Sequence, residues 1–512
     1  MESFKSNNRI IAKNTMFLYI RMMFTMLVAL FTSRIIFQKL GIDDFGIYQT
    51  VGGIVGFLSF LNGALSTGSS RFLTFELGSG DSEKLKKTFS SVLTVHIILA
   101  IVIAVFAEAI GLWFIYHKLV IPVQRLDAAV FAFHLSVLAS LLSITQIPYN
   151  ASIIAHEKMG VYAYVSIYEV ITKLAICFLI GLGGWDKLKF YAILIFLVQT
   201  SILIFYRFYC SSHFKETKYE PIFDKTILKP ILSFSGWSLF ANSAIALSNE
   251  GILLLLNMFF SPAIVASRAI SIQVNMAANQ FVQNFRTAAN PQIVKKYAAH
   301  EFEESKHLLL ESTKLSYYLM FAISLPVCLL AKPLLRMWLG QIPPYADIFL
   351  QLIIIQSLFS VFDTSFYTAL YAKGRLKENA LISPLLVFIA FPIVYFLLKM
   401  GYSPVVLSWA YLFVYVLLGL LIKPILIIKV VNYTWSDIYS VFSPCLLVTV
   451  IASVLAIILH KIMNDESFLQ FIFQAITIVI IVCITTFVFG LSKSMKHKLK
   501  SVLFIKLRLL AK

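Results

Sequence analysis

Long apolar runs recur along the whole chain, and short charged stretches separate them. A helix needs about 20 apolar residues to cross a hydrocarbon core of about 30 Å, and most of these runs reach that length. Turn residues such as Asp43-Asp44, Gly183-Gly184 and Pro343-Pro344 mark the ends of several runs. The pattern predicts about fourteen membrane-spanning helices, joined by loops. Their ranges are 14–38, 45–70, 90–116, 127–151, 160–183, 188–208, 233–257, 262–288, 308–331, 346–371, 380–399, 404–428, 440–461 and 467–490.

The composition agrees with a chain that lies in a membrane along its whole length. Of its 512 residues, 59% are hydrophobic and 13% are charged, whereas about 25% are charged in a typical soluble domain. A net charge of +18 would suggest a nucleic-acid partner if the basic residues shared one soluble face. They lie instead between the apolar runs. We therefore expect an all-α integral membrane protein and no nucleic-acid partner.

The basic residues also predict the orientation of the chain. Counted over alternate connections, they favour one side of the membrane by about three to one, and the N-terminus and the C-terminal tail share that side. Basic residues are enriched in cytosolic loops, so both ends are expected in the cytosol. The first apolar run contains Arg21 and no small-residue cleavage site, so it is interpreted as a retained span rather than a signal peptide.

The two halves of the chain resemble each other. A shift of about 221 residues lays the first block of six spans over the next six. Because six is even, both blocks have the same orientation, as in a parallel repeat with a substrate cavity between its halves. We expect an N-terminal lobe at 1–215, a C-terminal lobe at 216–430, and two extra spans with a basic cytosolic tail at 431–512.

The span at 262–288 carries a stripe of polar residues at intervals of three or four. These positions fall within about 120° of helical arc. Polar groups inside a bilayer face water or one another, so the stripe faces either a wet cavity or a polar partner helix. The cavity is favoured because guanidinium groups at both ends of the stripe suit an anionic ligand. The stripe consists of Arg268, Ser271, Asn275, Asn279, Gln283 and Arg286.

The span at 45–70 occupies the matching place in the first half and has a looser polar face that ends at Arg71. Its small residues can line a cavity or mark tight helix packing, and the sequence leaves both interpretations open. Arg21 lies among apolar residues in the first span, and its counterpart in the repeat is Asn242. The polar face consists of Gln49, Gly52, Gly56, Ser59, Asn62, Ser66 and Ser70.

Acidic residues within the spans are few. Glu250 and Asp363 could each bind a coupling proton or sodium ion, or could neutralise an arginine; the second role is preferred. Glu169 and Lys173 are four residues apart and are expected to pair. The chain has no nucleotide-binding loop, no metal-ligand pattern and no nucleophile motif. We therefore expect no catalytic residue, no metal and no cofactor, and transport driven by an ion or substrate gradient.

One segment resembles a known family. Leu40-Gly41, Phe45-Gly46 and Tyr48 are followed by Gly68-Ser69-Ser70 just before Arg71. This segment is similar to the start of the polysaccharide biosynthesis transporters. These lipid-linked oligosaccharide flippases of the O-antigen type belong to the MOP superfamily, which also contains the MATE exporters. The resemblance implies alternating access between two lobes and an undecaprenyl-diphosphate-linked glycan as the ligand, with arginines for the diphosphate.

The expected function is a flippase of the bacterial inner membrane that serves O-antigen or capsule synthesis. Its expected partners are the lipid-linked oligosaccharide, membrane lipids and a polysaccharide polymerase complex. The main alternative is an ion-coupled MATE-type exporter of cationic drugs, which should carry acidic rather than basic cavity residues. A membrane scaffold would have no use for a polar path across the bilayer. An integral-membrane glycosyltransferase would need a larger loop than any in this chain.

Overall fold

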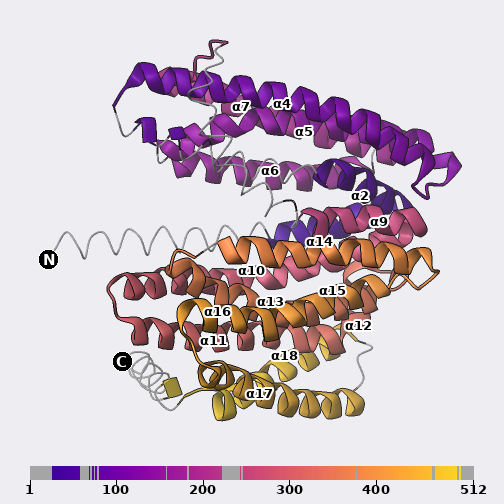
Figure 1. Ribbon diagram of the computed structural model, residues 1–512. Helices are drawn as coiled ribbons and strands as arrows, with labels where there is room; N and C mark the ends of the chain where they lie inside the picture. Colours follow the sequence, from indigo (N-terminus) through magenta and orange to yellow (C-terminus); the bar gives the residue numbers. More distant parts are fainter. Residues whose placement is uncertain are drawn as a thin grey trace, which may run out of the picture. The chain divides into compact units, whose positions relative to one another are not determined.

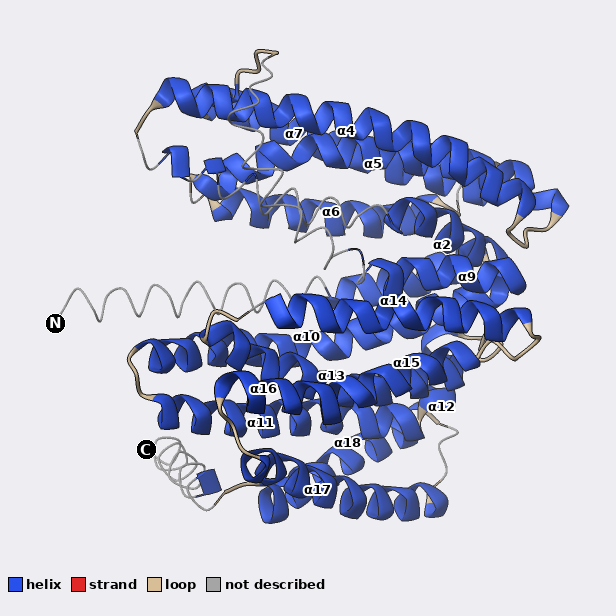
Figure 2. Cartoon of the chain, viewed as in Figure 1, coloured by secondary structure: helices blue, strands red, loops and turns tan. Residues whose placement is uncertain are grey.

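The computed structural model describes residues 26–57, 69, 72–73, 75–77, 80–156, 158–181, 184–221, 243, 246–375, 377–463, 467–492 and 495–496. Within these ranges the chain consists of helices joined by loops, without any strand (Figure 2). Nine of the described helices are long and apolar enough to cross a membrane. The predicted all-α membrane fold with about fourteen spans is therefore confirmed.

Most predicted spans correspond to a single helix. Some helices are longer than a bilayer needs: α4 has 36 residues and α10 has 37, which at 1.5 Å per residue is about 55 Å. Such helices extend beyond the hydrocarbon core at one or both ends. The single helices are α2 (Ile42–Phe57), α4 (Ser82–His117), α5 (Leu126–Ala155), α6 (Met159–Leu179), α7 (Lys187–His213), α10 (Pro262–Ala298), α11 (Phe302–Leu329), α13 (Ala346–Ala372), α14 (Lys377–Lys399) and α17 (Trp435–Ile462).

Three predicted spans contain a π-helical turn. The turn η3 (Leu247–Gly251) precedes α9 (Ile252–Phe259), and η5 (Thr486–Gly490) follows α18 (Phe468–Thr485). The span predicted at 404–428 is formed by α15 (Val406–Leu417), η4 (Leu418–Ile422) and α16 (Lys423–Val431). Turns of this kind often occur at functional sites, and two of these three adjoin a charged side chain described below.

One stretch predicted as a loop is partly helical. The connection between residues 331 and 346 contains α12 (Ala331–Leu339). Its buried residues Ala331, Leu335 and Leu339 are four positions apart, so they share one face that packs against the protein. The prediction was wrong here because a helix of nine residues is too short to appear as a membrane span.

Contacts group the chain into two compact units. Unit 1 comprises Met1–Ile270, Pro343–Tyr345 and Pro384–Val406, and unit 2 comprises Ser271–Ile342, Ala346–Ser383 and Leu407–Lys512. This grouping describes which segments pack together and does not test the repeat, so the lobe boundaries at 215 and 430 remain a prediction. Helices α10 and α14 contribute residues to both units.

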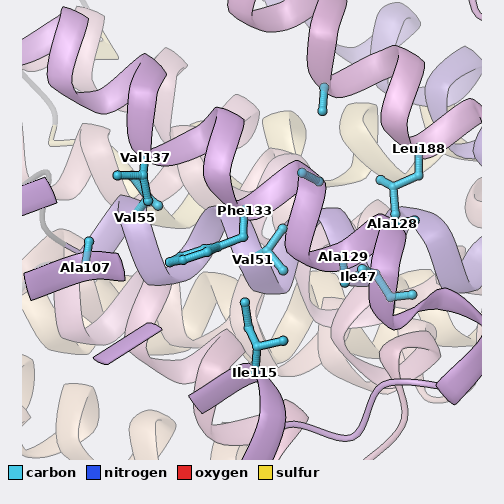
Figure 3. Close-up of a cluster of buried hydrophobic side chains, with 12 residues drawn as sticks. Ile47, Val51, Val55, Ala107, Ile115, Ala128, Ala129, Phe133, Val137 and Leu188 are labelled. Carbon is cyan, nitrogen blue, oxygen red and sulfur yellow. The ribbon is translucent and has the colours of Figure 1, made fainter. Parts of the chain in front are cut away.

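Unit 1 is built around α5, which packs against both α4 and α7 (Figure 1). Figure 3 shows an apolar cluster in this unit, in which Val51 of α2 and Phe133 of α5 are fully buried. Gly111 of α4 leaves room for the Phe133 ring, since a Cβ there would lie 2.3 Å from it. On α6, Lys173 Nζ lies 2.6 Å from Glu169 Oε1, which confirms the predicted pair.

In unit 2, α11 packs against α13 and against the C-terminal helices α17 and α18. The Tyr317 ring of α11 stacks on Phe362 of α13, with centroids 5.0 Å apart. Each C-terminal helix begins with a capping box, formed by Thr434 with Asp437 in α17 and by Ser467 with Gln470 in α18. These boxes satisfy free N–H groups in the first turn and fix where each helix starts.

Candidate substrate path

The polar stripe of α10 makes hydrogen bonds to α13 within unit 2. Ser271 Oγ donates to the Ala346 carbonyl oxygen at 3.2 Å. Ser357 Oγ donates to Asn275 Oδ1 at 2.6 Å, and Asn279 Nδ2 donates to Ser357 Oγ at 3.1 Å. Buried polar atoms in a bilayer need such partners. In these bonds α13 acts as the polar partner helix, which is one of the two interpretations of the stripe. The other interpretation, that the stripe lines a wet cavity, stays a prediction.

Arg286 lies at the far end of the stripe and is only 6% exposed. Its Nη2 donates to the backbone carbonyl oxygen of Thr364 and to Thr368 Oγ1, both on α13. The Thr368 hydroxyl donates in turn to Asn290 Oδ1 of α10, at 3.3 Å. These acceptors are neutral, so they orient the guanidinium without cancelling its charge.

Asp363, next to Thr364 on α13, forms an ion pair with a second buried cation, Lys423. Its Oδ1 lies 3.1 Å from Nζ of Lys423, which is 1% exposed. Asp363 directly precedes Thr364, whose backbone carbonyl oxygen accepts a hydrogen bond from Arg286. One carboxylate therefore stands among two buried cations. We name Arg286, Asp363, Thr364, Thr368 and Lys423 the Arg286 cluster.

The sequence did not single out Lys423, although a lysine inside the apolar run LGLLIKPILII was a visible signal. The structure explains how it reaches Asp363. It follows η4 directly, and η4 approaches α13 closely at Gly419. A Cβ at Gly419 would lie 2.4 Å from the Phe359 carbonyl oxygen, so only glycine fits there.

Glu250 lies elsewhere, in unit 1, on the π-helical turn η3. It packs against the glycine face of α2: a Cβ at Gly56 would lie 3.2 Å from Glu250 Cδ, and one at Gly53 would lie 3.7 Å from its Oε2. Gly56 thus makes the close helix contact that the packing interpretation expects. Glu250 belongs to unit 1, whereas Asp363 belongs to unit 2.

The remaining predicted site residues differ in exposure. Arg268 belongs to unit 1 and is 2% exposed, while Gln283 in unit 2 is exposed. Arg21, Arg71 and Asn242 lie outside the described residues. Among the described residues, no predicted site residue lines the apolar cavity of about 720 Å³ that unit 2 holds between α11, α13, η4 and α17.

Long apolar helices with polar and charged groups buried among them define a multi-pass membrane protein. A more particular assignment comes from the family whose model is described as "Polysaccharide biosynthesis protein", which matches residues 39–342. The chain belongs to this family. No curated protein matches it.

Solved structures show the same fold. The chain is similar to a structure described as "Lipid II flippase MurJ, inward closed conformation", with a TM-score of 0.68, 14% identity, and coverage of 91% of this chain and 98% of that one. It is also similar to an outward-facing multidrug resistance MATE family transporter of the MOP superfamily, with a TM-score of 0.54, 15% identity, and 81% and 95% coverage. A MOP superfamily transporter from Pyrococcus furiosus gives a TM-score of 0.54 at 16% identity, with 81% and 95% coverage. The chain thus has the fold of the MOP flippases and transporters.

Proposed function

We propose that this protein flips an undecaprenyl-diphosphate-linked oligosaccharide from the cytosolic to the outer leaflet of the bacterial inner membrane. Membership of the polysaccharide biosynthesis family and the flippase fold support this function. The glycan serves O-antigen or capsule synthesis, and a polymerase complex receives it on the outer side. The protein acts by alternating access between the lobes at 1–215 and 216–430, with both termini in the cytosol, and carries out no catalysis.

The single observation that carries the proposal is the Arg286 cluster. It holds two buried cations, Arg286 and Lys423, and one carboxylate, Asp363. A charge in the interior of a membrane protein is costly unless an opposite charge meets it. A diphosphate supplies such a charge, and a guanidinium can bind phosphate oxygens in a bidentate manner.

The other predicted residues take supporting roles in this proposal. Arg21, Arg71 and Arg268 offer further positive charge to the diphosphate as it moves. Asn242, Ser271, Asn275, Asn279 and Gln283 offer hydroxyl and amide groups to the glycan. The apolar cavity of unit 2, lined by residues such as Phe321, Leu325 and Leu446, suits the lipid tail.

An ion-coupled MATE-type exporter of cationic drugs is the second candidate, and the likeness to MATE structures favours it. Such an exporter should present carboxylates to its ligand. In the Arg286 cluster the carboxylate of Asp363 is already paired with Lys423. Glu250 is the better candidate for an ion-coupling group, because its neighbours on α2 are the glycines Gly53 and Gly56 rather than basic side chains.

The proposal is tested by replacing Arg286 with Gln in the native host. Surface glycan should fall at least about tenfold, because the loss of one charged hydrogen-bonding group costs roughly 1.5–3 kcal/mol. Arg336→Gln is the matched control, since Arg336 is an exposed arginine on α12. Arg268→Gln should also reduce export. Membrane abundance is measured for each variant, and unchanged glycan in a well-expressed Arg286→Gln strain would contradict the proposal.

A further inference from the structure

A small cavity with several polar side chains in its wall lies within unit 1, between α2, α5 and α7. Its volume is about 270 Å³. On α5, Ser136, Ser140 and Ser143 follow one another at intervals of four and three residues, so they share one face of the helix. Tyr48 of α2 and Gln199 of α7 complete the polar part of the wall. We name this cavity the serine pocket.

The wall of the serine pocket mixes five polar side chains with apolar ones and carries no formal charge. Among the described residues that form its wall there is no Asp, Glu, Lys, Arg or His. A charged ligand group would lose its hydration here and gain no opposite charge, which is costly. Hydroxyl and amide groups, in contrast, can both donate and accept hydrogen bonds. The wall therefore suits a neutral ligand that is rich in hydroxyl groups.

The two α2 glycines in the pocket wall have different surroundings. A Cβ at Gly56 would press against Glu250, so glycine there serves a close contact. A Cβ at Gly52 would meet nothing within 4 Å, although Gly52 also lines the pocket. Glycine is disfavoured within a helix. No close neighbour requires glycine at position 52, and the missing side chain leaves that part of the pocket open.

The volume of the serine pocket limits the size of the ligand. Ligand pockets commonly measure about 300–1,000 Å³, and this one lies just below that range. It has room for one sugar ring and not for an oligosaccharide. Tyr48 and Phe196 also line the pocket, and aromatic side chains can supply apolar surface to the C–H groups of such a ring.

We propose that the serine pocket binds one uncharged hexose ring of the lipid-linked oligosaccharide. This inference rests on the proposed function and adds a subsite for the sugar to it. The hydroxyls of Ser140 and Ser143 and the amide of Gln199 exchange hydrogen bonds with the ring hydroxyls. The pocket thereby distinguishes a glycosylated carrier from the bare carrier.

The experiment measures binding of two defined lipids to the purified full-length protein in detergent. The probes are undecaprenyl diphosphate and undecaprenyl diphosphate that carries a single glucose. Wild type should bind the glucosylated lipid about tenfold more tightly, since several hydrogen bonds together give a factor of this order. Gly52→Leu places a larger side chain in the pocket wall at a position where a Cβ meets nothing within 4 Å. It should take up the space for the sugar ring, so the variant should bind both lipids equally.

Gly160→Leu is the matched control. A Cβ at Gly160 also meets nothing within 4 Å, but Gly160 lies on α6, outside the pocket wall. This variant should keep the wild-type preference. If Gly52→Leu does not fold, Ser140→Ala takes its place and should reduce the preference about threefold by loss of one hydrogen bond.

The outcomes separate this inference from the proposed function. If wild type binds both lipids equally, or if the pocket variant that folds keeps the full preference, the sugar subsite is overturned while diphosphate recognition stands. If wild type binds neither lipid, the proposed function fails, and the sugar subsite fails with it.

Discussion

The serine pocket of unit 1 and the Arg286 cluster of unit 2 are both polar regions inside apolar helices, but they differ in charge. The pocket offers hydroxyl groups around empty space. The cluster offers two cations and one carboxylate in a packed arrangement between α10, α13 and α16. A hydroxyl can be satisfied by water or by its own helix, as Ser136 is by the Ala132 carbonyl oxygen. A buried cation requires an anion.

This difference indicates which part of a ligand each region can hold. A neutral wall can hold a sugar ring at little cost, whereas a cluster with excess positive charge favours phosphate. A lipid-linked glycan contains both groups. The predictions below test whether the two regions differ as described, and they begin with the largest expected effect.

Asp363→Asn should destabilise the protein most. It removes the carboxylate that lies 3.1 Å from Nζ of Lys423, a side chain that is 1% exposed. Breaking a buried ion pair from one side typically costs about 3–5 kcal/mol. Thermal unfolding in detergent measures the loss. The double variant Asp363→Asn with Lys423→Met is neutral at both positions and should regain most of the stability; a double variant no better than the single one would contradict the account.

Replacing glycine by alanine should have opposite effects in the two regions. Gly419→Ala brings a Cβ to 2.4 Å from the Phe359 carbonyl oxygen, so η4 must move away from α13. We expect a loss of about 1–3 kcal/mol, as for other overpacked sites. Gly52→Ala meets open space and should raise stability by up to about 1 kcal/mol, because alanine favours the helix. The comparison fails if both variants shift the unfolding midpoint in the same direction.

The smallest effect is expected at an ionic site outside the spans. Arg125 donates to Asp44 Oδ1 at 2.7 Å and to Asp186 Oδ1 at 3.2 Å, at the ends of helices in unit 1. The Arg125 hydrogen bond lowers the pKa of Asp186 below its usual value of 3.8, while burial raises the pKa of Asp44. An aspartate with a lowered pKa stabilises the fold above pH 3.8, and this contribution is lost as the pH falls through the folded-state pKa.

The corresponding measurement is the unfolding midpoint of wild type and Asp186→Asn between pH 7 and pH 3. Wild type should lose stability below about pH 4 through Asp186, and the variant should lack that part of the decline. Because Asp186 is partly exposed, the contribution should stay under about 1 kcal/mol. Asp44 shares Arg125 with Asp186, and the Asp186 charge contributes to its raised pKa, so the comparison measures the loss of Asp186 together with its effect on Asp44. Identical pH profiles would contradict the assignment.

Much of the fold could be predicted from hydropathy, because a bilayer leaves the backbone few alternatives to helices. The spans at 90–116 and 346–371 lie within α4 and α13. The π-helical turns and α12 could not be predicted, since they depend on local packing and not on the length of an apolar run. At η4, Gly419 lies close to Phe359 of α13. The hydrophobic periodicity of the sequence does not reveal such a contact.

The site was less predictable for a related reason. Spacing places Asn275, Asn279 and Arg286 on one face of a helix, but it does not say which helix lies opposite. The acceptors Ser357 and Thr364 come from α13, which lies about 80 residues further along the chain. Likewise the sequence left the roles of Gly52 and Gly56 open, and only their neighbours in space distinguish them.

The central claim, that the excess positive charge around Arg286 recognises a diphosphate, is tested most directly by binding of undecaprenyl diphosphate and undecaprenol. Both lipids are offered to the purified protein under the same conditions. Wild type should bind the diphosphate at least about tenfold more tightly, and Arg286→Gln should lose most of this preference. Equal preference for the diphosphate in wild type and in a folded Arg286→Gln variant would contradict the account.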